Sequence, residues 1–372
     1  MKTIISNLKE KFNIDGNLLD YEIMKSGHIN TTLIVRFEID GKIKEYVFQK
    51  INKYVFKNPE DVMENISNVT NFIKDKLKSR GENYSRKVLK FYPSETGKYF
   101  SIDDKGDYWR VYKFINKSVS FNETENLEIL EETGKAFGEF QQLLEGFPIK
   151  QLNIIIPHFH NTVDRYRIFK EVLEINPVGR AKYVKKEIEQ FLNLEKVATK
   201  MYKMQKKGLL KLRVTHNDTK CNNVLFNEET RKYQCVIDLD TIMPGLIGFD
   251  YGDAIRFGAN SCSEDETNLD DVYLNFDKFE ALTKGFISKV GGVLSQEEKD
   301  TLALGAITMT TECGLRFLTD YLGGDKYFKT EYSEHNLDRA KCQLKLAQDM
   351  IKNHDKMQAI INLYCKNNSI EK

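Results

Sequence analysis

The sequence predicts an α+β chain in two parts, a small β-rich N-terminal lobe over residues 1–115 and a large helical C-terminal lobe over 116–372. Three observations predict this division. Apolar residues alternate along 33–47, as they do in a half-buried pair of strands. They recur at helical spacing through most of the chain after residue 120. Finally, 372 residues with 41% apolar content can bury a large core and exceed the usual size of one domain.

The N-terminal lobe is predicted to contain a β-hairpin followed by a helix. The apolar residues of the first strand lie on one face because they alternate: Leu33, Val35, Phe37 and Ile39. Asp40-Gly41 is a two-residue hairpin turn, and a second strand follows through Val47. Asn58 then offers an N-cap and Pro59 suits a first helical turn. The apolar residues behind them recur at helical spacing: Val62, Ile66, Val69, Ile73 and Leu77.

A further strand and several helices complete the predicted order. The run DYWRVYKFI at 107–115 has the aromatic and β-branched residues of a last N-terminal strand. We expect one helix over 127–144, a single helix over 181–207 that ends before Gly208, and several more from about residue 296.

A polar run between the helices carries the chemistry. Residues 215–226 read THNDTKCNNVLF, and His216, Asp218 and Asn223 have the H-x-D-x-x-x-x-N spacing of kinase catalytic loops. In such a loop the aspartate accepts the proton of the acceptor hydroxyl and the asparagine binds magnesium. We therefore predict Asp218 as the catalytic base, in contact with the acceptor, and Asn223 as a metal ligand. His216 is interpreted as a structural residue.

A second run, QCVIDLDTIMPG at 234–245, supplies carboxylates close behind the first. Asp238 follows the apolar residues 235–237, which suit a buried strand, and residues 224–226 suit its hairpin partner. Asp240 is a second carboxylate two residues further on. Carboxylate and amide oxygens are the hard ligands that Mg²⁺ prefers. Asp238 and Asp240 are therefore predicted to bind the metal together with Asn223.

Several runs resemble a known superfamily. DTKxNNVL, VIDLDTxMPG and GFDYGDAIRFG at 248–258 are similar to the aminoglycoside phosphotransferases and choline kinases. Three further runs narrow the likeness to the N-acetylhexosamine 1-kinases: KSGHINTT at 25–32, YVFQKIN at 46–52 and TTECGLRFLTDYLGG at 310–324. The likeness spans most of the chain. It implies a bilobal, protein-kinase-like fold that uses ATP and Mg²⁺.

The resemblance also implies where the nucleotide binds. The loop over the ATP phosphates would include Ser26, Gly27, Asn30 and Thr31, which offer backbone N–H groups and short polar side chains. The end of the 107–115 strand would place Lys113 and Ile115 at the adenine, through main-chain contacts. The alternative for these residues is an ordinary loop and a plain core strand.

The strand over 46–50 departs from the superfamily pattern. Kinases carry a phosphate-pairing lysine in a V-A-I-K run, but the register of YVFQ places Gln49 toward the nucleotide instead of Lys50. Either Gln49 contacts phosphate as a neutral donor, or a bulge brings Lys50 around; the period of two makes both together improbable. We favour Gln49.

The acceptor site is predicted from polar and aromatic residues within apolar helices. Besides Asp218, the predicted acceptor-binding residues are His28, Arg256, Phe257, Arg316 and Tyr321. Arg316 has an equally weighted alternative, an ion pair with Asp320 one helical turn away. His160, Asn161 and Arg165 are expected at the rim of the acceptor cleft, and Asp250 is expected to anchor the catalytic loop.

Composition argues against several other classes of protein. The 56 basic and 55 acidic residues nearly cancel, without the basic excess typical of nucleic-acid binders. The sequence has neither a signal peptide's apolar core nor the roughly 20 apolar residues of a membrane span, which predicts a soluble, cytoplasmic protein. Six cysteines without a C-x-x-C pair favour reduced thiols over a zinc site or disulfides.

The sequence thus predicts an ATP-dependent kinase acting on the anomeric hydroxyl of an N-acetylhexosamine, GlcNAc or GalNAc, with the oligomeric state left open. One alternative is a kinase of another small molecule, such as an amino alcohol, another sugar or an aminoglycoside. A cationic acceptor should demand an acid-lined pocket, and Arg256 and Arg316 argue against one. The other alternative is a nucleotide-binding pseudokinase, which the complete set of base and metal ligands disfavours.

Overall fold

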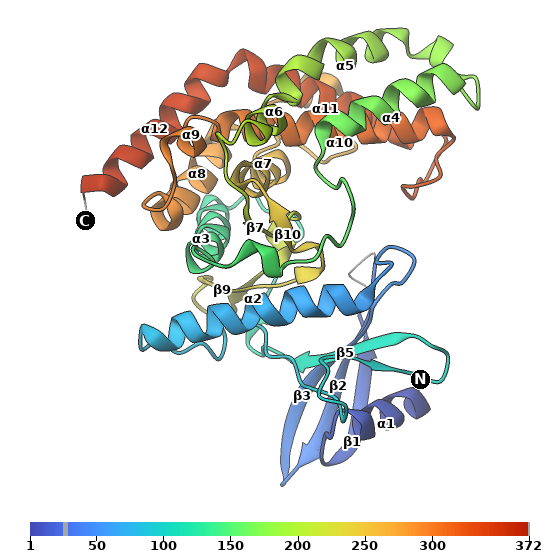
Figure 1. Cartoon of the computed structure of the whole chain (residues 1–372), viewed down its shortest axis with the longest axis vertical. Helices are drawn as coiled ribbons and strands as arrows, with labels where there is room; N and C mark the ends of the chain where they lie inside the picture. Colours follow the sequence, from blue (N-terminus) through green and yellow to red (C-terminus); the bar gives the residue numbers. More distant parts are fainter. Residues whose placement is uncertain (25–28, 371–372) are drawn as a thin grey trace. The chain divides into compact units, whose positions relative to one another are not determined.

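The computed structural model describes residues 1–24 and 29–370. The chain divides into two compact units, each built from several segments. Unit 1 comprises Met1–Val119, Gly146–Pro157 and Leu225–Met243. Unit 2 comprises Ser120–Glu145, His158–Val224 and Pro244–Lys372. Strands dominate the first unit and helices the second, which confirms the predicted α+β class (Figure 1).

Unit 1 is built on an antiparallel sheet in the order β1-β2-β3-β5-β4 (Figure 1). Its strands are β1 (Asn17–Ile23), β2 (Thr31–Ile39), β3 (Lys42–Lys50), β4 (Ser101–Ile102) and β5 (Tyr108–Lys113). The predicted hairpin is confirmed, because β2 and β3 pair and are joined at Asp40 and Gly41. Both turn residues have positive φ, 52° and 68°, as a hairpin turn that follows the twist of the strands requires.

The two faces of this sheet differ in character. One face buries an apolar cluster in which Phe37, Phe48 and Trp109 pack against Ile5 and Leu8 of the helix α1 (Lys2–Lys11). Since strand side chains alternate, the residues between them point to the other face. That second face carries the polar residues described below. The sequence analysis did not predict α1 or β1.

The helix α2 (Pro59–Ser79) begins at the predicted proline. Asn58 occupies the N-cap position, as predicted, although its side chain makes no capping hydrogen bond. The buried Asn65 of α2 instead donates to the carbonyl oxygens of Asn153 and Ile242, both at 2.9 Å. These bonds tie α2 to the two later segments of unit 1.

A second, three-stranded sheet in the order β6-β8-β9 contains the predicted hairpin. It consists of β6 (Ser118–Val119), β8 (Val224–Asn227) and β9 (Tyr233–Val236). Beyond β9, Asp238 has the left-handed backbone angles φ 58° and ψ 61° and precedes the short helix η4 (Leu239–Thr241). The conformation is uncommon for a residue other than glycine and marks a sharp change of chain direction.

Unit 2 consists mainly of helices (Figure 1). They are α3 (Leu127–Leu143), α4 (Thr162–Ile175), α5 (Lys185–Ala198), α6 (Lys200–Lys206), α7 (Ile247–Gly258), α8 (Phe276–Val290), α9 (Gln296–Lys299), α10 (Leu302–Gly323), α11 (His335–Lys352) and α12 (His354–Ile370). The short strands β7 (Arg213–Thr215) and β10 (Met243–Gly245) pair with each other. The helix α10 packs against α4, α5, α7 and α11.

The single helix predicted over 181–207 is wrong. A short helix, η2 (Arg180–Tyr183), precedes α5, and α5 and α6 are separated at Thr199. Thr199 has φ −85° and ψ −2°; its backbone N–H donates to the carbonyl oxygen of Glu195 at 3.0 Å, and its hydroxyl donates to the same oxygen at 2.7 Å. The period of the apolar residues continues across the break and therefore did not reveal it.

Glycines let α7 and α10 approach closely. A Cβ atom at Gly252 would lie 2.4 Å from the carbonyl oxygen of Gly305, and one at Gly305 would lie 2.3 Å from that of Gly248. None of the cysteines among the described residues forms a disulfide. In the part of the chain that the structure describes, none of the helices is both long enough and apolar enough to cross a membrane.

Candidate functional site

The predicted base and one predicted metal ligand lie together in unit 2. The chain leaves β7, passes His216 and Asp218, and reaches Asn223 in the short helix η3 (Cys221–Asn223). Asn223 donates from Nδ2 to the carbonyl oxygen of Asp218 at 2.8 Å and to its Oδ2 at 3.0 Å. Because both contacts use the amide nitrogen, the Asn223 amide oxygen is directed away from the Asp218 carboxylate. His216 is fully buried between Phe137 and Phe140, as expected of a structural residue.

Asp250, at the start of α7, fixes the backbone of this loop. Its carboxylate accepts from the backbone N–H groups of His216 at 2.9 Å and Asn217 at 2.8 Å, and from Gln141 Nε2 at 2.7 Å. Burial raises the pKa of Asp250 above its ordinary value, although these donors oppose the rise. The predicted anchoring role of Asp250 is confirmed. Three residues on, the Asp253 carboxylate accepts from the backbone N–H of Thr219 at 3.1 Å.

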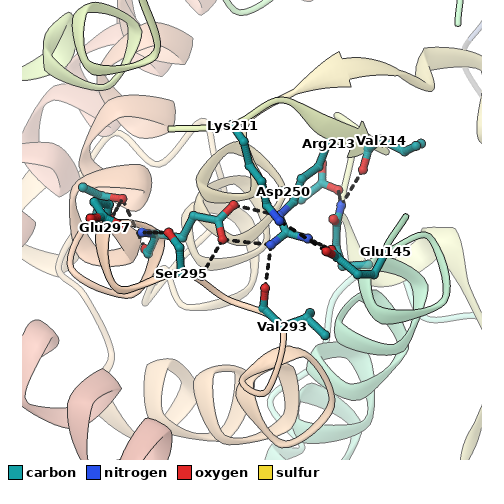
Figure 2. A network of polar contacts seen from close by, with 11 residues as sticks. Glu145, Lys211, Arg213, Val214, Asp250, Val293, Ser295 and Glu297 are labelled. Atoms are coloured by element: carbon teal, nitrogen blue, oxygen red, sulfur yellow. Dashed lines mark hydrogen bonds and ion pairs between the residues drawn. The ribbon is translucent and has the colours of Figure 1, made fainter. Parts of the chain in front are cut away.

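The strand that leads into the loop is held by a buried ion-pair network (Figure 2). Arg213 donates to Glu298 through Nε at 2.7 Å and through Nη2 at 2.8 Å, and it also pairs with Glu145. Its Nη2 reaches the carbonyl oxygen of Val293 as well, at 2.8 Å. Glu298 is in turn fixed by a capping box with Ser295 at the start of α9. β7 is thereby tied to the helical body of unit 2.

A cation lies beside the predicted base. Lys220 Nζ is 3.1 Å from Asp218 Oδ1 and 5.7 Å from the centre of the Phe257 ring. The Asp218 carboxylate, and after it that of Asp253, raise the pKa of Lys220 above its ordinary value. Lys220 therefore stays protonated next to the base. Sequence reasoning did not single out Lys220, although it stands two residues after Asp218.

The predicted acceptor residue Arg256 is buried in α7 and carries two carboxylate partners. Its Nε donates to Asp253 at 2.9 Å, and its Nη1 donates to Glu264. The charge of Arg256 is therefore balanced within unit 2. The sequence argument that Arg256 opposes a cationic acceptor does not hold, because a compensated guanidinium adds little net positive charge to the site.

A pocket within unit 2 adjoins this ion pair. Its lining includes Glu123, Glu125, Arg256, Phe257, Glu264 and Lys278. Lys278 Nζ donates to Glu125 at 2.7 Å, so this lysine too is paired. The lining thus carries three carboxylates, those of Glu123, Glu125 and Glu264, and two basic residues, Arg256 and Lys278, each of which is paired with a carboxylate.

A second polar cluster in unit 2 joins α4, α10 and the segment before α4. The Glu312 carboxylate contacts His160 Nδ1 at 2.9 Å and accepts from the Thr162 hydroxyl at 2.6 Å. Nε2 of His160 and Nε of Arg165 are buried and have no hydrogen-bond partner among the described residues. Arg165 also donates to the carbonyl oxygen of Phe159 at 2.8 Å. Glu312 was missed from the sequence, and the position of His160, Asn161 and Arg165 at the rim of an acceptor cleft stays a prediction.

The two remaining acceptor predictions in α10 have different surroundings. Arg316 is half-buried, and its guanidinium lies 5.4–5.8 Å from the ring centres of Phe159, Tyr327 and Phe328. Among the described residues it forms no ion pair with Asp320, whose carboxylate instead accepts from three backbone N–H groups at 326–328. Tyr321 is buried in the apolar core of unit 2 and donates its hydroxyl to Glu334 at 3.2 Å.

In unit 1, the polar face of the sheet collects four residues. Arg110 of β5 donates through Nε to Gln49 Oε1 at 2.9 Å and through Nη2 to the same oxygen at 2.6 Å. Its Nη1 pairs with the buried Asp240. Asn30 donates to the other carboxylate oxygen of Asp240, and Asn30 Oδ1 accepts from the backbone of Asn52 at 2.9 Å. Both oxygens of Asp240 therefore already have partners within this unit.

The strand register shows which of Gln49 and Lys50 lies on the same face of the sheet as Arg110. β3 runs without a bulge, so Gln49 lies on the face of Arg110 and Thr32, and its Nε2 donates to the Thr32 hydroxyl at 2.8 Å. Lys50 lies on the other face and pairs with Asp107 at 3.2 Å. The alternative in which a bulge turns Lys50 around is not observed.

The other predicted nucleotide residues occupy strand ends. Thr31 begins β2, next to Asn30. Lys113 ends β5, where its N–H donates to the carbonyl oxygen of Lys90 at 2.9 Å, and Ile115 is buried two residues later. Ser26, Gly27 and His28 lie outside the described residues.

The residues predicted to bind magnesium fall in both units. Asn223 belongs to unit 2, while Asp238 and Asp240 belong to unit 1. Their donor chemistry suits the ion, since the Asn223 amide oxygen is turned away from Asp218 and Asp238 carries a carboxylate. Asp240 fits less well because Arg110 and Asn30 already engage it.

Comparison with known proteins assigns the family. Residues 88–284 match the APH phosphotransferase enzyme family, and this stretch is more than half of the chain. The chain belongs to this family. The matching region contains Arg110, the loop with Asp218 and Asn223, and the run with Asp238.

Solved structures share the fold of this phosphotransferase at low sequence identity. A microcompartment-associated aminopropanol kinase has a TM-score of 0.64 and 13% identity over 96% of this chain and 99% of its own. Choline kinase from Cryptosporidium parvum Iowa II has a TM-score of 0.58 and 15% identity over 98% and 99%. A spectinomycin phosphotransferase in complex with ADP and spectinomycin has a TM-score of 0.57 and 14% identity over 95% and 98%.

Proposed function

We propose that this phosphotransferase transfers the γ-phosphoryl group of ATP to the C1 hydroxyl of an N-acetylhexosamine, GlcNAc or GalNAc. Phosphoryl transfer is supported by the hydrogen bond between Asn223 and Asp218. The loop that holds both residues is fixed by Asp250, whose carboxylate accepts from two backbone N–H groups of the loop. A base held in this way needs no reorganisation when the acceptor arrives.

Asp218 accepts the proton of the attacking hydroxyl in this proposal. The Asn223 N–H keeps one carboxylate oxygen oriented, and the Lys220 ammonium lies 3.1 Å from the other. Lys220 is also a cation close to where negative charge passes between the two substrates, which stabilises the transferring group.

Asn223 and Asp238 would hold magnesium, and Asp240 is a further candidate. The ion, when bound, neutralises charge on the nucleotide phosphates. Within the chain, these residues supply neutral and anionic oxygen ligands of the kind that Mg²⁺ prefers. ATP as donor is further supported by the ADP complex of the spectinomycin phosphotransferase, which shares the fold.

Support for a sugar acceptor comes from sequence runs and from side chains of unit 2. The HIN, RFG and RFLTDYL runs resemble the N-acetylhexosamine 1-kinases. Phe257 offers an aromatic ring next to Lys220, and a sugar ring or an N-acetyl methyl group can pack on such a face. The buried, unpartnered nitrogens of His160 and Arg165 offer hydrogen bonds to sugar hydroxyls.

An amino alcohol is the second candidate acceptor. The balanced charge of Arg256 and the carboxylates Glu123, Glu125 and Glu264 in the pocket of unit 2 suit a cationic ligand better than the sequence suggested. An aminopropanol kinase and a choline kinase are also among the proteins with this fold.

One assay decides between the candidates. ATP consumption is measured with Mg²⁺ over a panel of free hexosamines, N-acetylhexosamines, amino alcohols and aminoglycosides. The proposal expects the highest kcat/KM with an N-acetylhexosamine and a product phosphate that mild acid hydrolyses, as an anomeric phosphate does. Highest kcat/KM with ethanolamine or aminopropanol, and an acid-stable product, would instead establish the second candidate. Nucleotide binding without turnover on any acceptor would indicate a pseudokinase.

A further inference from the structure

The β3 strand of this phosphotransferase lacks the lysine that pairs with nucleotide phosphates in kinases, and a buried arginine stands on the neighbouring strand at the same level. We propose that Arg110 of β5 and Gln49 of β3 together donate hydrogen bonds from unit 1 to the nucleotide phosphates, in the place of that lysine. This inference rests on the proposed use of ATP.

The strand register places the two side chains together. Gln49 pairs with Arg110 across β3 and β5, and with Thr32 across β3 and β2, so all three share one face of the sheet. Two N–H groups of Arg110 point at Gln49 Oε1, at 2.9 and 2.6 Å. The amide oxygen of Gln49 is thereby fixed toward Arg110, and its NH₂ group is turned toward Thr32 at 2.8 Å.

The neighbouring lysines of β3 and its following loop cannot take this role in the observed register. Lys50 points to the opposite face and pairs with Asp107 at 3.2 Å, and Lys53 pairs with the same carboxylate at 3.3 Å. Of the two described residues that pair with Gln49 across the strands, Thr32 and Arg110, Arg110 is the cation. It is 3% exposed and therefore held in place by its surroundings.

Arg110 retains hydrogen-bonding capacity in this arrangement. A guanidinium has five N–H donors in a planar fork that matches the geometry of phosphate. The described residues engage Nε and Nη2 through Gln49, and Nη1 through Asp240, with the Met63 sulfur 3.7 Å from Nη1. Nη2 and the Gln49 amide nitrogen each carry a second N–H, and these two donors are available to an anion.

Asp240 and Asn30 hold the arginine in position. Asp240 pairs with Arg110 through one oxygen and accepts from Asn30 through the other. Asn30 belongs to the HIN run that the resemblance places over the phosphates. Asn30, Arg110 and Gln49 are therefore linked within unit 1. A lysine at position 49 would meet the Arg110 charge directly. Because Gln49 is neutral, it can accept hydrogen bonds from the Arg110 cation without charge repulsion.

The test uses the full chain and measures ADP and adenosine binding by calorimetry in the absence of acceptor. Arg110→Gln should weaken ADP binding by about 10–100-fold, the usual worth of a charge-assisted hydrogen bond, and leave adenosine binding unchanged. Arg110→Lys should retain part of the ADP affinity. Lys50→Gln is the matched control, since it removes a lysine from the opposite face of the same sheet.

A stricter test places a lysine at position 49 of β3 and removes the charge of Arg110 on β5. Gln49→Lys alone should weaken ADP binding through like-charge repulsion, and adding Arg110→Gln should restore it at least tenfold relative to Gln49→Lys alone. In turnover assays, Arg110→Gln should raise the KM for ATP more than it lowers kcat. A thermal melt of each variant shows whether it is folded.

The outcomes separate this inference from the proposed function. Absence of ADP binding by the wild type overturns the proposed function itself. If the wild type binds ADP and folded Arg110→Gln binds it equally well, Arg110 does not bind phosphate. If Arg110→Gln fails to fold, the double variant decides: recovery of ADP affinity over Gln49→Lys supports the inference, and no recovery overturns it.

Discussion

Asn223 donates its side-chain N–H to Oδ2 of Asp218 at 3.0 Å and to the backbone carbonyl oxygen of the same residue at 2.8 Å. These two contacts use the amide nitrogen alone, so the amide oxygen faces elsewhere. One residue therefore orients the proposed base and leaves an oxygen for a metal. The two functions can be separated by substitution, because they use opposite ends of one amide group.

Asp218→Asn should lower kcat by about 10²–10⁴-fold, the usual contribution of a positioned base, while ATP binding stays close to that of the wild type. The substitution keeps the size of the side chain and removes its ability to accept the hydroxyl proton. Steady-state turnover and calorimetric ATP binding measure the two effects. Near-normal turnover would refute the assignment of Asp218 as the base.

Asn223→Ala should raise the Mg²⁺ concentration for half-maximal rate by about tenfold or more, since it removes an oxygen ligand. Asn223→Asp keeps an oxygen at the same place but loses both N–H contacts with Asp218. In that variant the Mg²⁺ requirement should stay near the wild-type value while kcat falls. Equal Mg²⁺ titration curves for Asn223→Ala and the wild type would exclude Asn223 from the metal site.

Local chemistry explains which parts of the fold were predictable from the sequence. The turn at Asp40 and Gly41 was predicted because these residue types tolerate the positive φ that the turn requires. The contact of Asp218 with Asn223 follows from a spacing of five residues on one loop. By contrast, the break between α5 and α6 at Thr199 leaves the apolar period unchanged, so the period could not reveal it.

Contacts distant in sequence explain what was missed at the candidate site. Arg110 is separated from Asp240 by 130 positions, and His160 from Glu312 by 152. No local pattern encodes such pairings, because they depend on strand register and on how helices pack. An arginine in the middle of the strand YWRVYK, between apolar and aromatic residues, was the available signal for Arg110, since a buried charge there requires a partner.

Glu298→Gln should destabilise the folded protein by about 3–5 kcal/mol, because it leaves the buried Arg213 without its main anionic partner. Arg213 and Glu298 have side chains that are 5% and 2% exposed, and two hydrogen bonds join them (Figure 2). Lys211→Gln is the control, since its pair with Glu145 is exposed and worth about 0–1 kcal/mol.

Denaturant unfolding at neutral pH gives both free-energy changes for the Arg213 network. Because β7 leads into the catalytic loop, kcat should fall in Glu298→Gln below the temperature at which it unfolds. The expectation fails if the two variants lose equal stability, since the network would then contribute no more than a surface ion pair.

Glu312→Gln should remove part of the acid sensitivity of unit 2. Burial alone raises the pKa of Glu312, but the His160 ring, Arg165 and the Thr162 hydroxyl outweigh it, so the pKa lies below the ordinary value of 4.5. A carboxyl group whose pKa is lowered on folding stabilises the protein above its unfolded pKa, and this contribution is lost as the pH falls through the folded pKa.

The stability difference between wild type and Glu312→Gln should therefore be largest at pH 6–7 and shrink as the pH falls below about 4.5. Thermal melts between pH 7 and 3.5 measure the difference, with the exposed Glu189→Gln as the control for a surface carboxylate. A constant difference over this range would show that Glu312 has the same pKa in the folded and unfolded chain. A difference that grows toward acid pH would mean that burial outweighs the contacts with His160, Arg165 and Thr162, and that Glu312 is protonated more readily in the folded protein.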